Sequence, residues 1–545
     1  MNNFDLLLAF ALATGMSIAL IPILIKHAGL LGMIDAPDER KIHKQAIPRC
    51  GGLAIALSVL IVILLLVKLN PMTTGLLLGG SIIVIFGLLD DAIDLHYRWK
   101  FLGQILAVAV VMAVGVVFEK LPFFGLEDAP VWLTYPLTLL FIVGVTNAVN
   151  LSDGLDGLAA GTMLLSFAFI AAFAVYFGGL EIALVALATI GGLIGFLRFN
   201  THPAIVFMGD SGSQFIGFIA ANLSIILTQQ LNPVFSPALP ILILGLPILD
   251  TLSVMIQRLR AGKSPFSADK RHIHHKLMSY GLLHPQAVAI IYIIQSFFLF
   301  GAFIFRYSHF GIILSYFLFL TGCIFLTFYY ATAQKVDFTS SQSSLKRRTP
   351  FWRQDWIFSC CRYYIELTLC LFLLVLSTVI YYHEQFNWVL EAKIFALAIS
   401  ITFIIPPKIQ LFIVRLTFYI AGAISVYTIE ISNFKDTLGV SIDIFFLLLL
   451  VVTSIAVRVT RKTYFTLNNQ DLLVLLFIGV AITFINTDYL IRGLSYLCCL
   501  GYALEYLLNR DIYKYQILRC FSFTYLLNLG VFAWFQGWLI TEIIL

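Results

Sequence analysis

The chain has 545 residues, of which 60% are hydrophobic and 12% are charged, and its mean hydropathy is +0.95. A soluble protein of this length carries about twice that charged fraction, so the composition excludes an ordinary soluble enzyme. Apolar runs long enough to cross a bilayer recur from end to end, which predicts an all-α polytopic membrane protein. The net charge of +5 says little in such a protein, and we expect no nucleic-acid partner.

Eleven apolar stretches in the first part of the chain come close to the roughly 20 residues that a bilayer requires. They cover residues 4–25, 51–67, 74–89, 101–118, 132–148, 158–177, 182–199, 213–231, 238–256, 287–305 and 310–331. The first stretch lacks the basic start of a cleaved signal peptide. We therefore expect it to be the first membrane helix, with the N-terminus outside.

Lysines and arginines gather in alternate loops. The first loop, the third loop and the ninth loop are rich in them, and another group follows the eleventh stretch. By the positive-inside rule, the odd-numbered loops are predicted to be cytoplasmic.

The second part of the chain begins with a polar, serine-rich and basic stretch at 334–355 that resembles a linker. About seven further membrane spans are expected after Tyr363. We predict a catalytic membrane domain at 1–333, a cytoplasmic linker at 334–362 and a C-terminal membrane module at 363–545. This module contains no dense polar cluster, and its role is not legible from the sequence.

Five unusual polar clusters in the first part all fall on the predicted cytoplasmic side, which indicates one shared site. The clusters are the first loop with Asp35, Asp38 and Lys44; Asp90, Asp91 and Asp94; the run 147–156; the run 208–213; and the run 269–276. Scattered polar residues would fall on both sides of the membrane.

The acidic residues in these clusters have competing interpretations. Asp90 and Asp91 end a membrane helix, where the helix dipole disfavours carboxylates, so they need a cation, a proton or a substrate group. The alternative is a solvated acid pair. Asp210 and Asp153 each precede a membrane span and are either N-caps or ligands. Asp156, one turn after Asp153, is not explained by a single cap.

The run His272-Ile273-His274-His275 stands among lysines and an arginine, a mixture of donors that suits a diphosphate. A zinc site and a structural histidine cluster are the alternatives for this run. Carboxylates with asparagine suit magnesium, which favours oxygen ligands and bridges phosphates. Acids for a metal and bases for a diphosphate at a membrane edge suggest phosphoryl transfer between a nucleotide and a lipid.

Four motifs in series resemble those of the polyprenyl-phosphate N-acetylhexosamine-1-phosphate transferase family. They are GLLDD at 87–91, NAVNLSDGLDGLA at 147–159, FMGDSGS at 207–213 and HIHHKL at 272–277. The resemblance covers about 4–331, and the HIHH run is similar to that of WecA/TagO-type initiating transferases. Lys276 departs from the arginine of many relatives and lacks its planar fork.

The resemblance implies about ten or eleven spans and a magnesium cofactor, with manganese as an alternative. It implies transfer of an N-acetylhexosamine 1-phosphate, foremost GlcNAc-1-phosphate, from a UDP-sugar to undecaprenyl phosphate, with release of UMP. It places the site on the cytoplasmic face of a bacterial inner membrane, where the reaction initiates a cell-envelope glycan such as O-antigen. A homodimer is one assembly that the C-terminal module could support.

The resemblance also implies residue roles on the metal and acceptor side. Asp210 is the main magnesium ligand and Asn150 a second one. Asp90 and Asp91 face the acceptor phosphate, which Asp90 positions or deprotonates. Lys44 meets the lipid phosphate.

On the donor side, the implied residues are acids and amides near the nucleotide and basic groups near the diphosphate. They are Asp153, Asp156 and Asn147, followed by Arg271, His272, His274 and His275. We expect the lipid phosphate to attack the β-phosphorus directly, although a two-step route through an aspartyl-phosphate stays open. A transporter with buried carboxylates is the alternative function class, but transporters place such residues near the midplane rather than at span ends.

Overall fold

The computed structural model describes residues 3–35, 46–121, 130–264 and 271–334, together with isolated positions between 419 and 503. The chain divides into two compact units, Met1–Lys346 with Asn468–Asn486, and Arg347–Leu467 with Thr487–Leu545. All the elements below belong to the first unit. The predicted linker and the seven predicted C-terminal spans lie almost wholly outside the described residues, so the domain boundaries and this number of spans stay predictions.

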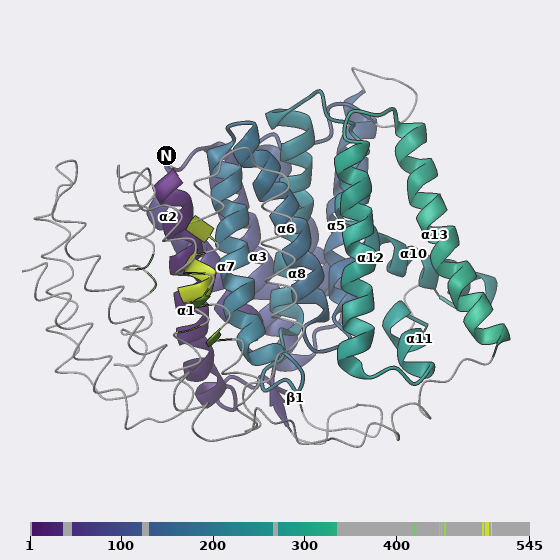
Figure 1. The fold of residues 1–545 in the computed structure, drawn as a ribbon. Helices are drawn as coiled ribbons and strands as arrows, with labels where there is room; N and C mark the ends of the chain where they lie inside the picture. The colour runs from purple at the N-terminus through teal and green to yellow at the C-terminus, as the bar shows by residue number, and fades with distance from the viewer. Residues whose placement is uncertain are drawn as a thin grey trace, which may run out of the picture. The chain divides into compact units, whose positions relative to one another are not determined.

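The first unit is helical, as the sequence predicts (Figure 1). Its α-helices are α1 (Asn3–His27), α2 (Gly51–Leu66), α3 (Pro71–Ile93), α4 (Tyr97–Ala113), α5 (Val131–Ser152), α6 (Leu158–Tyr176), α7 (Leu180–Asn200), α8 (Gly209–Ile226), α9 (Leu239–Ile243), α10 (Gly245–Arg260), α11 (Ile273–Ser279), α12 (His284–Ile304) and α13 (Phe310–Ala333). A π-turn, η1 (Leu227–Leu231), continues α8. The short strands β1 (Ile34–Asp35) and β2 (Ile47–Pro48) pair antiparallel, with Ile34 opposite Pro48.

Eight of the described helices are long and apolar enough to span a membrane, so the protein is a multi-pass membrane protein. They are α1, α3, α5, α6, α7, α8 with η1, α12 and α13. The expected count of eleven spans is not confirmed, because α2 and α4 are shorter and the predicted span at 238–256 is two helices.

The break between α9 and α10 follows from proline chemistry. Pro247 has no N–H and cannot bond to the carbonyl of Ile243 one turn earlier. That carbonyl instead accepts hydrogen bonds from Gln295 Nε2 at 2.9 Å and Ser166 Oγ at 2.8 Å. The amide N–H of Leu246 donates to Gln295 Oε1 at 3.1 Å. One buried glutamine of α12 thus satisfies the backbone groups that the break exposes, as an apolar environment requires.

The centre of the unit is formed by α6, α7 and α8, whereas α13 is largely exposed. Both α3 and α5 pack on α8 (Figure 1). Glycines bring the backbones together at the start of α8: a Cβ on Gly52 would lie 2.2 Å from the Gly212 nitrogen, and one on Gly87 would lie 2.4 Å from the Ser211 Cα. Small residues of this kind let membrane helices approach closely. The N-terminus of α8 is therefore fixed against α2 and α3.

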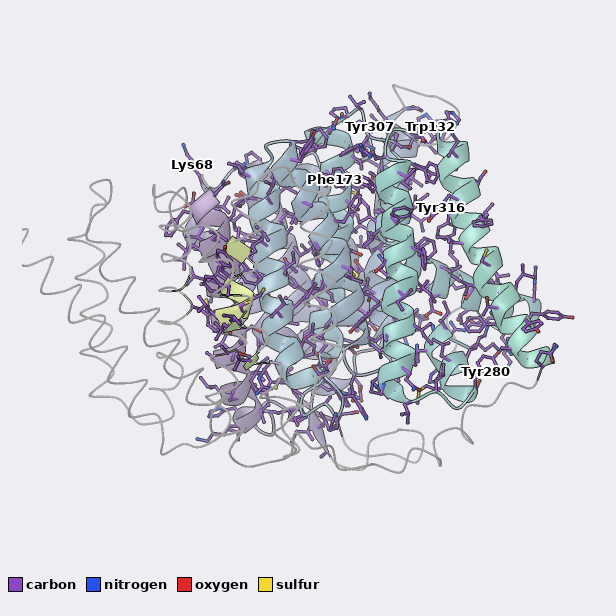
Figure 2. All side chains as sticks on the ribbon, viewed as in Figure 1. Lys68, Trp132, Phe173, Tyr280, Tyr307 and Tyr316 are labelled. Carbon is purple, nitrogen blue, oxygen red and sulfur yellow. The ribbon has the colours of Figure 1, made fainter. Side chains whose placement is uncertain are left out.

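The two ends of the bundle differ in character. Lys68, Trp132 and Tyr307 lie near the upper end in the view of Figure 2, and Tyr280 lies near the lower end. Exposed aromatic side chains at both ends are typical of membrane–water interfaces. The strand β1 and the helix α11 mark the lower end (Figure 1), and this end carries the polar clusters.

Candidate active site

A cavity of about 720 Å³ opens where the ends of α3, α5 and α12 meet the N-terminus of α8. Each of the five polar clusters contributes at least one residue to its lining. These residues include Asp35, Asp91, Asn150, Asp153, Asp156, Gly209, Asp210, Ser213 and His275. The structure therefore brings together segments that lie far apart in the sequence.

Asp91 holds the first turn of α8. One carboxylate oxygen accepts the amide N–H of Asp210 at 2.8 Å, and the other accepts the amide N–H of Ser211 at 3.1 Å. These amides have no partner inside their own helix, so Asp91 acts as an N-cap supplied by a different helix. Gly209 has a φ of +72°, and a Cβ there would lie 2.6 Å from Asp91 Oδ2. Glycine at 209 is thus required both by the backbone and by the carboxylate beside it.

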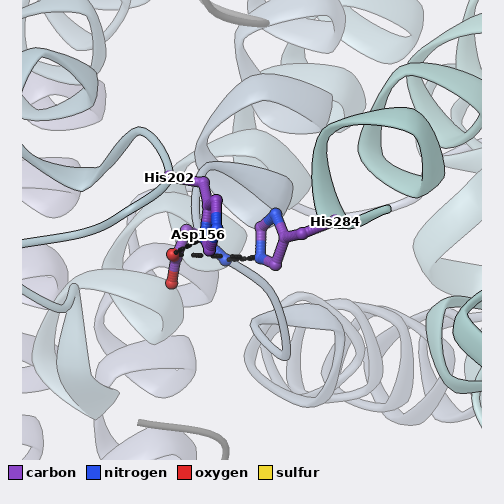
Figure 3. Close-up of side chains that lie close together, drawn as sticks. All are labelled: Asp156, His202 and His284. Carbon is purple, nitrogen blue, oxygen red and sulfur yellow. Dashed lines mark hydrogen bonds and ion pairs between the residues drawn. The ribbon is translucent and has the colours of Figure 1, made fainter. Parts of the chain in front are cut away.

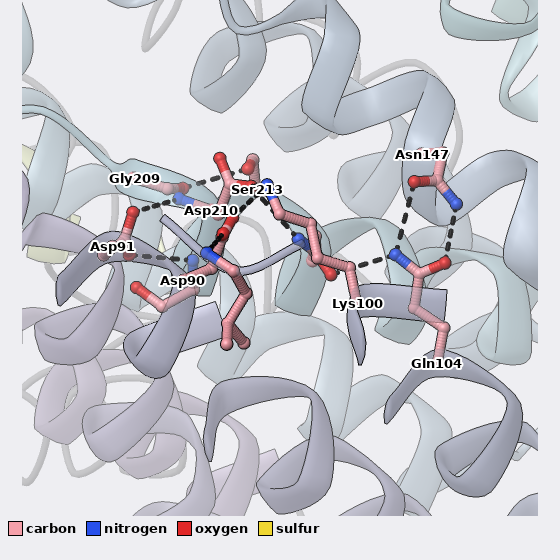
Figure 4. A network of polar contacts seen from close by, with 11 residues as sticks. Asp90, Asp91, Lys100, Gln104, Asn147, Gly209, Asp210 and Ser213 are labelled. Carbon is pink, nitrogen blue, oxygen red and sulfur yellow. Dashed lines mark hydrogen bonds and ion pairs between the residues drawn. The ribbon is translucent and has the colours of Figure 1, made fainter. Parts of the chain in front are cut away.

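Lys100, in the first turn of α4, joins two of the predicted acids (Figure 4). Its ammonium forms an ion pair with Asp90 and lies 3.1 Å from Asp210 Oδ2. The other oxygen of Asp90 accepts the amide N–H of Leu95 at 2.8 Å. Asp90 is only 4% exposed, so this lysine offsets the cost of burying its carboxylate.

A chain of side-chain amides extends from Asp210 toward α5 (Figure 4). Gln214 Nε2 lies 3.4 Å from Asp210 Oδ2, and Gln104 Nε2 donates to Gln214 Oε1 at 3.0 Å. Gln104 and Asn147 exchange amide hydrogen bonds at 2.7 and 3.3 Å. Asn147, predicted to bind substrate, therefore holds Gln104 in place in this structure.

The loop between α5 and α6 carries the next two acids into the cavity. Asp153 follows the last turn of α5, and its amide N–H bonds to the Asn150 carbonyl at 3.1 Å. Burial raises the pKa of Asp153 to about 7, and the nearby carboxylates of Asp210, Asp156 and Asp91 add to this. Asn150 lines the same cavity as Asp210.

Asp156 lies between two histidines from distant segments (Figure 3). Its Oδ2 is 2.7 Å from His202 Nδ1 and 3.9 Å from His284 Nε2. The same oxygen accepts the amide N–H of Ala204 at 3.2 Å. The two imidazole rings stack with centroids 4.2 Å apart. All three residues line the cavity.

The loop that carries Asp156 is anchored from behind. The amide N–H of Gly157 donates to Asn200 Oδ1 at 2.8 Å, and the Gly157 carbonyl accepts the hydroxyl of Tyr292 at 2.6 Å. The amide N–H of Asp156 donates to His284 Nε2 at 3.0 Å. Tyr292 and His284 both belong to α12, so this helix fixes the position of the loop.

The HIHH run divides between the cavity and the protein interior. His272 is buried and lies 2.8 Å from Asp250 Oδ2, while Asp250 Oδ1 accepts the amide N–H of Ile273. His274 is buried against Gly154, and burial lowers its pKa to about 3, so it is neutral. His275 alone of the three histidines lines the cavity.

The basic residues around this run have partners of their own. Arg271 donates to the Gln257 carbonyl at 3.2 Å. The ammonium of Lys276 lies 5.2 and 5.6 Å from the ring centroids of Phe325 and Phe328. Arg49, which no motif predicts, pairs with Asp35 in the cavity lining. Lys44 lies outside the described residues, and its role stays a prediction.

The cavity lining has an excess of carboxylates. Its described residues include five aspartates, one arginine and three histidines. Asp210, Asp153 and Asn150 offer oxygen atoms, which are the ligands that hard divalent cations prefer. The residues present therefore fit a magnesium ion.

Polar residues at the site that the sequence predictions do not include are Arg49, Lys100, Gln104, His202 and His284, among others. Lys100 carried a signal, because a lysine at the start of an apolar helix follows the acid pair by nine residues. The positive-inside rule explains a lysine at this position equally well, so the sequence alone does not assign Lys100 to the site. The two histidines stand alone in the sequence and carry no such signal.

Comparisons with known proteins bear on this site. The family described as glycosyl transferase family 4 matches residues 73–228, which run from α3 to η1. A probable undecaprenyl-phosphate N-acetylglucosaminyl 1-phosphate transferase of Bacillus subtilis is 40% identical over 293 residues, covering 53% of this chain and 82% of the relative. A decaprenyl-phosphate N-acetylglucosaminephosphotransferase of Mycobacterium tuberculosis is 36% identical over 313 residues, covering 50% and 76%.

An undecaprenyl-phosphate alpha-N-acetylglucosaminyl 1-phosphate transferase of Escherichia coli is 30% identical over 292 residues, covering 52% of this chain and 80% of the relative. The resemblance inferred from the four motifs is thereby confirmed. At 40% identity over four fifths of a relative, this multi-pass membrane protein belongs to glycosyl transferase family 4.

Proposed function

We propose that the protein transfers N-acetylglucosamine 1-phosphate from its UDP-sugar to undecaprenyl phosphate and releases UMP. The observation that carries this proposal is the Lys100 ammonium held between Asp90 and Asp210 at the edge of an acidic cavity. The names of the three relatives support the substrate class. They are all transferases, and the transporter alternative gains no support.

The cavity suits the donor. Its volume of about 720 Å³ falls within the range of small-molecule sites, roughly 300–1,000 Å³. Arg49 and His275 in the lining are donors for phosphate oxygens, whereas Asp153 and Asp156 accept hydrogen bonds from a nucleotide. Arg271, His272 and His274 would then support the α11 end of the cavity by holding its backbone.

Magnesium is the proposed cofactor, with manganese as the alternative. Asp210 and Asn150 would hold it, and the excess of carboxylates in the lining supports a cation there. When bound, the ion would neutralise charge on the diphosphate. Asp91 and Lys100 fix the backbone and the carboxylate of Asp210, and so prepare this ligand before any substrate arrives.

The acceptor side is assigned to Lys100 and Asp90. The Lys100 side chain is 33% exposed, so its ammonium can meet the lipid phosphate without leaving Asp210. Both oxygens of Asp90 are engaged, by Lys100 and by the Leu95 amide, which favours positioning of the lysine over proton removal. We therefore keep Asp90 on the acceptor side as a positioning residue and Asp91 as a support for Asp210.

The proposed reaction is one displacement. An oxygen of the lipid phosphate forms a bond to the β-phosphorus of the UDP-sugar, and the bond from this phosphorus to the bridging oxygen breaks. UMP leaves with that oxygen. Asp210 contacts Lys100, proposed to meet the lipid phosphate, and lines the cavity proposed for the UDP-sugar.

The cellular setting follows from the charge pattern. The lysine- and arginine-rich loops support a cytoplasmic site in a bacterial inner membrane. A lipid-linked aminosugar made there would initiate a cell-envelope glycan such as O-antigen. The C-terminal module is proposed to pair protomers, to hold the lipid or to dock a later enzyme of the same glycan pathway, without adding a catalytic side chain.

Purified protein in nanodiscs tests the proposal. UMP release should require both undecaprenyl phosphate and a UDP-sugar, should stop with EDTA, and should return with magnesium. Among UDP-GlcNAc, UDP-GalNAc and UDP-glucose, UDP-GlcNAc should be the best donor. If the protein takes up a solute into vesicles and releases no UMP, the transferase proposal is wrong and the transporter alternative is favoured.

A further inference from the structure

The cluster Asp156, His202 and His284 has a composition that the proposed reaction does not require. Oxygen ligands suffice for magnesium and an acid suffices for a nucleotide, yet two imidazoles converge on one carboxylate. One nitrogen from each histidine and one oxygen of Asp156 all lie within 4.8 Å of one another (Figure 3). Among the described residues, these three side chains form a group of histidine and acidic ligands close enough together to hold one metal ion.

The distances are near those of a tetrahedral metal site. Bonds of about 2.0–2.1 Å place neighbouring ligand atoms about 3.4 Å apart. The observed pairs from Asp156 Oδ2 are 2.7 Å to His202 Nδ1 and 3.9 Å to His284 Nε2. The first distance would lengthen by about 0.7 Å and the second would shorten by about 0.5 Å to satisfy the geometry. The three side chains come from the α5–α6 loop, the segment after α7 and the first turn of α12.

The protonation pattern also suits a metal. His284 Nε2 accepts a hydrogen bond from the Asp156 amide, so this nitrogen carries no proton and has a lone pair in place. His202 Nδ1 faces the Asp156 carboxylate, and a metal would replace the shared proton. Metal binding would break the hydrogen bond from the Asp156 amide N–H to His284 Nε2, at a cost of about 1 kcal/mol.

We propose that Asp156, His202 and His284 form a zinc site with an open fourth position facing the cavity. Two imidazoles and one carboxylate are a ligand set that zinc takes and magnesium does not favour. All three residues line the cavity, so the fourth ligand is water or an oxygen of a molecule bound there. The site is distinct from Asp210 and Asn150, which offer oxygen atoms only.

The site also implies regulation, which rests on the proposed function. Asp156 cannot hold zinc and meet the nucleotide with the same oxygen. Zinc and the UDP-sugar would therefore compete, and zinc would raise the apparent KM for the donor without changing that for the lipid.

Metal binding to the full-length protein tests the site directly. Tag-free protein in detergent, stripped of metal, is titrated with zinc in competition with a chromophoric chelator. We expect one bound equivalent that excess magnesium does not displace. Cobalt added alone should give the intense visible absorption of a tetrahedral site. Displacement of zinc by magnesium, or a weak octahedral cobalt spectrum, would overturn the proposal.

His202→Ala is the main variant, because this side chain is 45% exposed and lies outside the helices, in the segment after α7. It should lose the bound equivalent. His309→Ala is the matched control, since His309 is an exposed histidine at the start of α13, outside the cavity lining. Equal zinc binding by the wild type and His202→Ala would exclude the site, whether or not the protein releases UMP.

Discussion

Asp91 accepts hydrogen bonds from the backbone of Asp210 and of its neighbour, so the carboxylate predicted to meet the acceptor holds the turn that carries the proposed metal ligand. This contact links the end of α3 to the start of α8 over 119 residues of sequence. The neighbouring acid, Asp90, has a different partner in Lys100. Two adjacent aspartates thus have separate tasks, and variants can separate them.

Asp91→Asn should destabilise the fold as well as the site. An amide presents only one acceptor oxygen, so one of the two α8 amides would face an NH₂ group. We expect a loss of about 1–3 kcal/mol of unfolding free energy, together with lower turnover. Thermal unfolding in detergent measures the first effect. Asp90→Asn is the comparison, and if both variants unfold at the same temperature as the wild type, the capping role is wrong.

Asp210→Asn should abolish UMP release while the protein stays folded. The amide keeps the shape of the side chain but removes the charge that magnesium and Lys100 both require. We expect turnover at least about 100-fold below the wild type, a loss of roughly 3 kcal/mol in transition-state stabilisation. Elution as a monodisperse peak establishes folding. Near-normal turnover of this variant would remove Asp210 from the metal site.

Lys100→Gln should affect the acceptor more than the donor. The variant removes the cation between Asp90 and Asp210 and leaves the cavity lining unchanged. The KM for undecaprenyl phosphate should rise and kcat should fall, with little change in the KM for the UDP-sugar. Lys68→Gln, an exposed lysine at the other end of the bundle, is the control. A change confined to the donor KM would contradict the assignment.

Single replacements in the HIHH run should differ from one another. His275→Ala should raise the KM for the UDP-sugar, because this side chain alone of the three lines the cavity. His272→Ala should lower the unfolding temperature, since it leaves Asp250 buried without its imidazole partner. Steady-state kinetics with thermal unfolding distinguish the two effects. Identical kinetic profiles for all three variants would speak for a shared diphosphate site.

A chain ending near Gln334 should still insert and release UMP. The described cavity lining ends at His284, and the aligned part of the chain already covers 80% of the Escherichia coli relative. Turnover is expressed per folded molecule, and thermal unfolding measures stability separately. A folded truncation without turnover would show that the C-terminal module completes the site.

The sequence predicts the helices well, because each apolar stretch had to satisfy its backbone within the membrane. It also predicts that Asp153, Asp210 and His275 meet, since charge bias placed their loops on one side. It does not predict that Pro247 and Gln295 divide one span into two helices, because the glutamine lies 52 residues beyond the Ile243 carbonyl. His202 and His284 were missed for the same reason: their meaning arises from long-range contacts.

The anchoring of the Asp156 loop by α12 has a consequence for biogenesis. Tyr292 and His284 follow the backbone groups that they fasten by 135 and 128 residues. Three membrane-spanning helices, α6, α7 and α8 with η1, and the shorter helices α9, α10 and α11 are therefore synthesised between the loop and its anchors. Until α12 enters the bilayer, the Gly157 carbonyl lacks its hydroxyl partner. The described cavity lining is therefore complete only once the start of α12 has been synthesised, because His284 is its last residue along the chain.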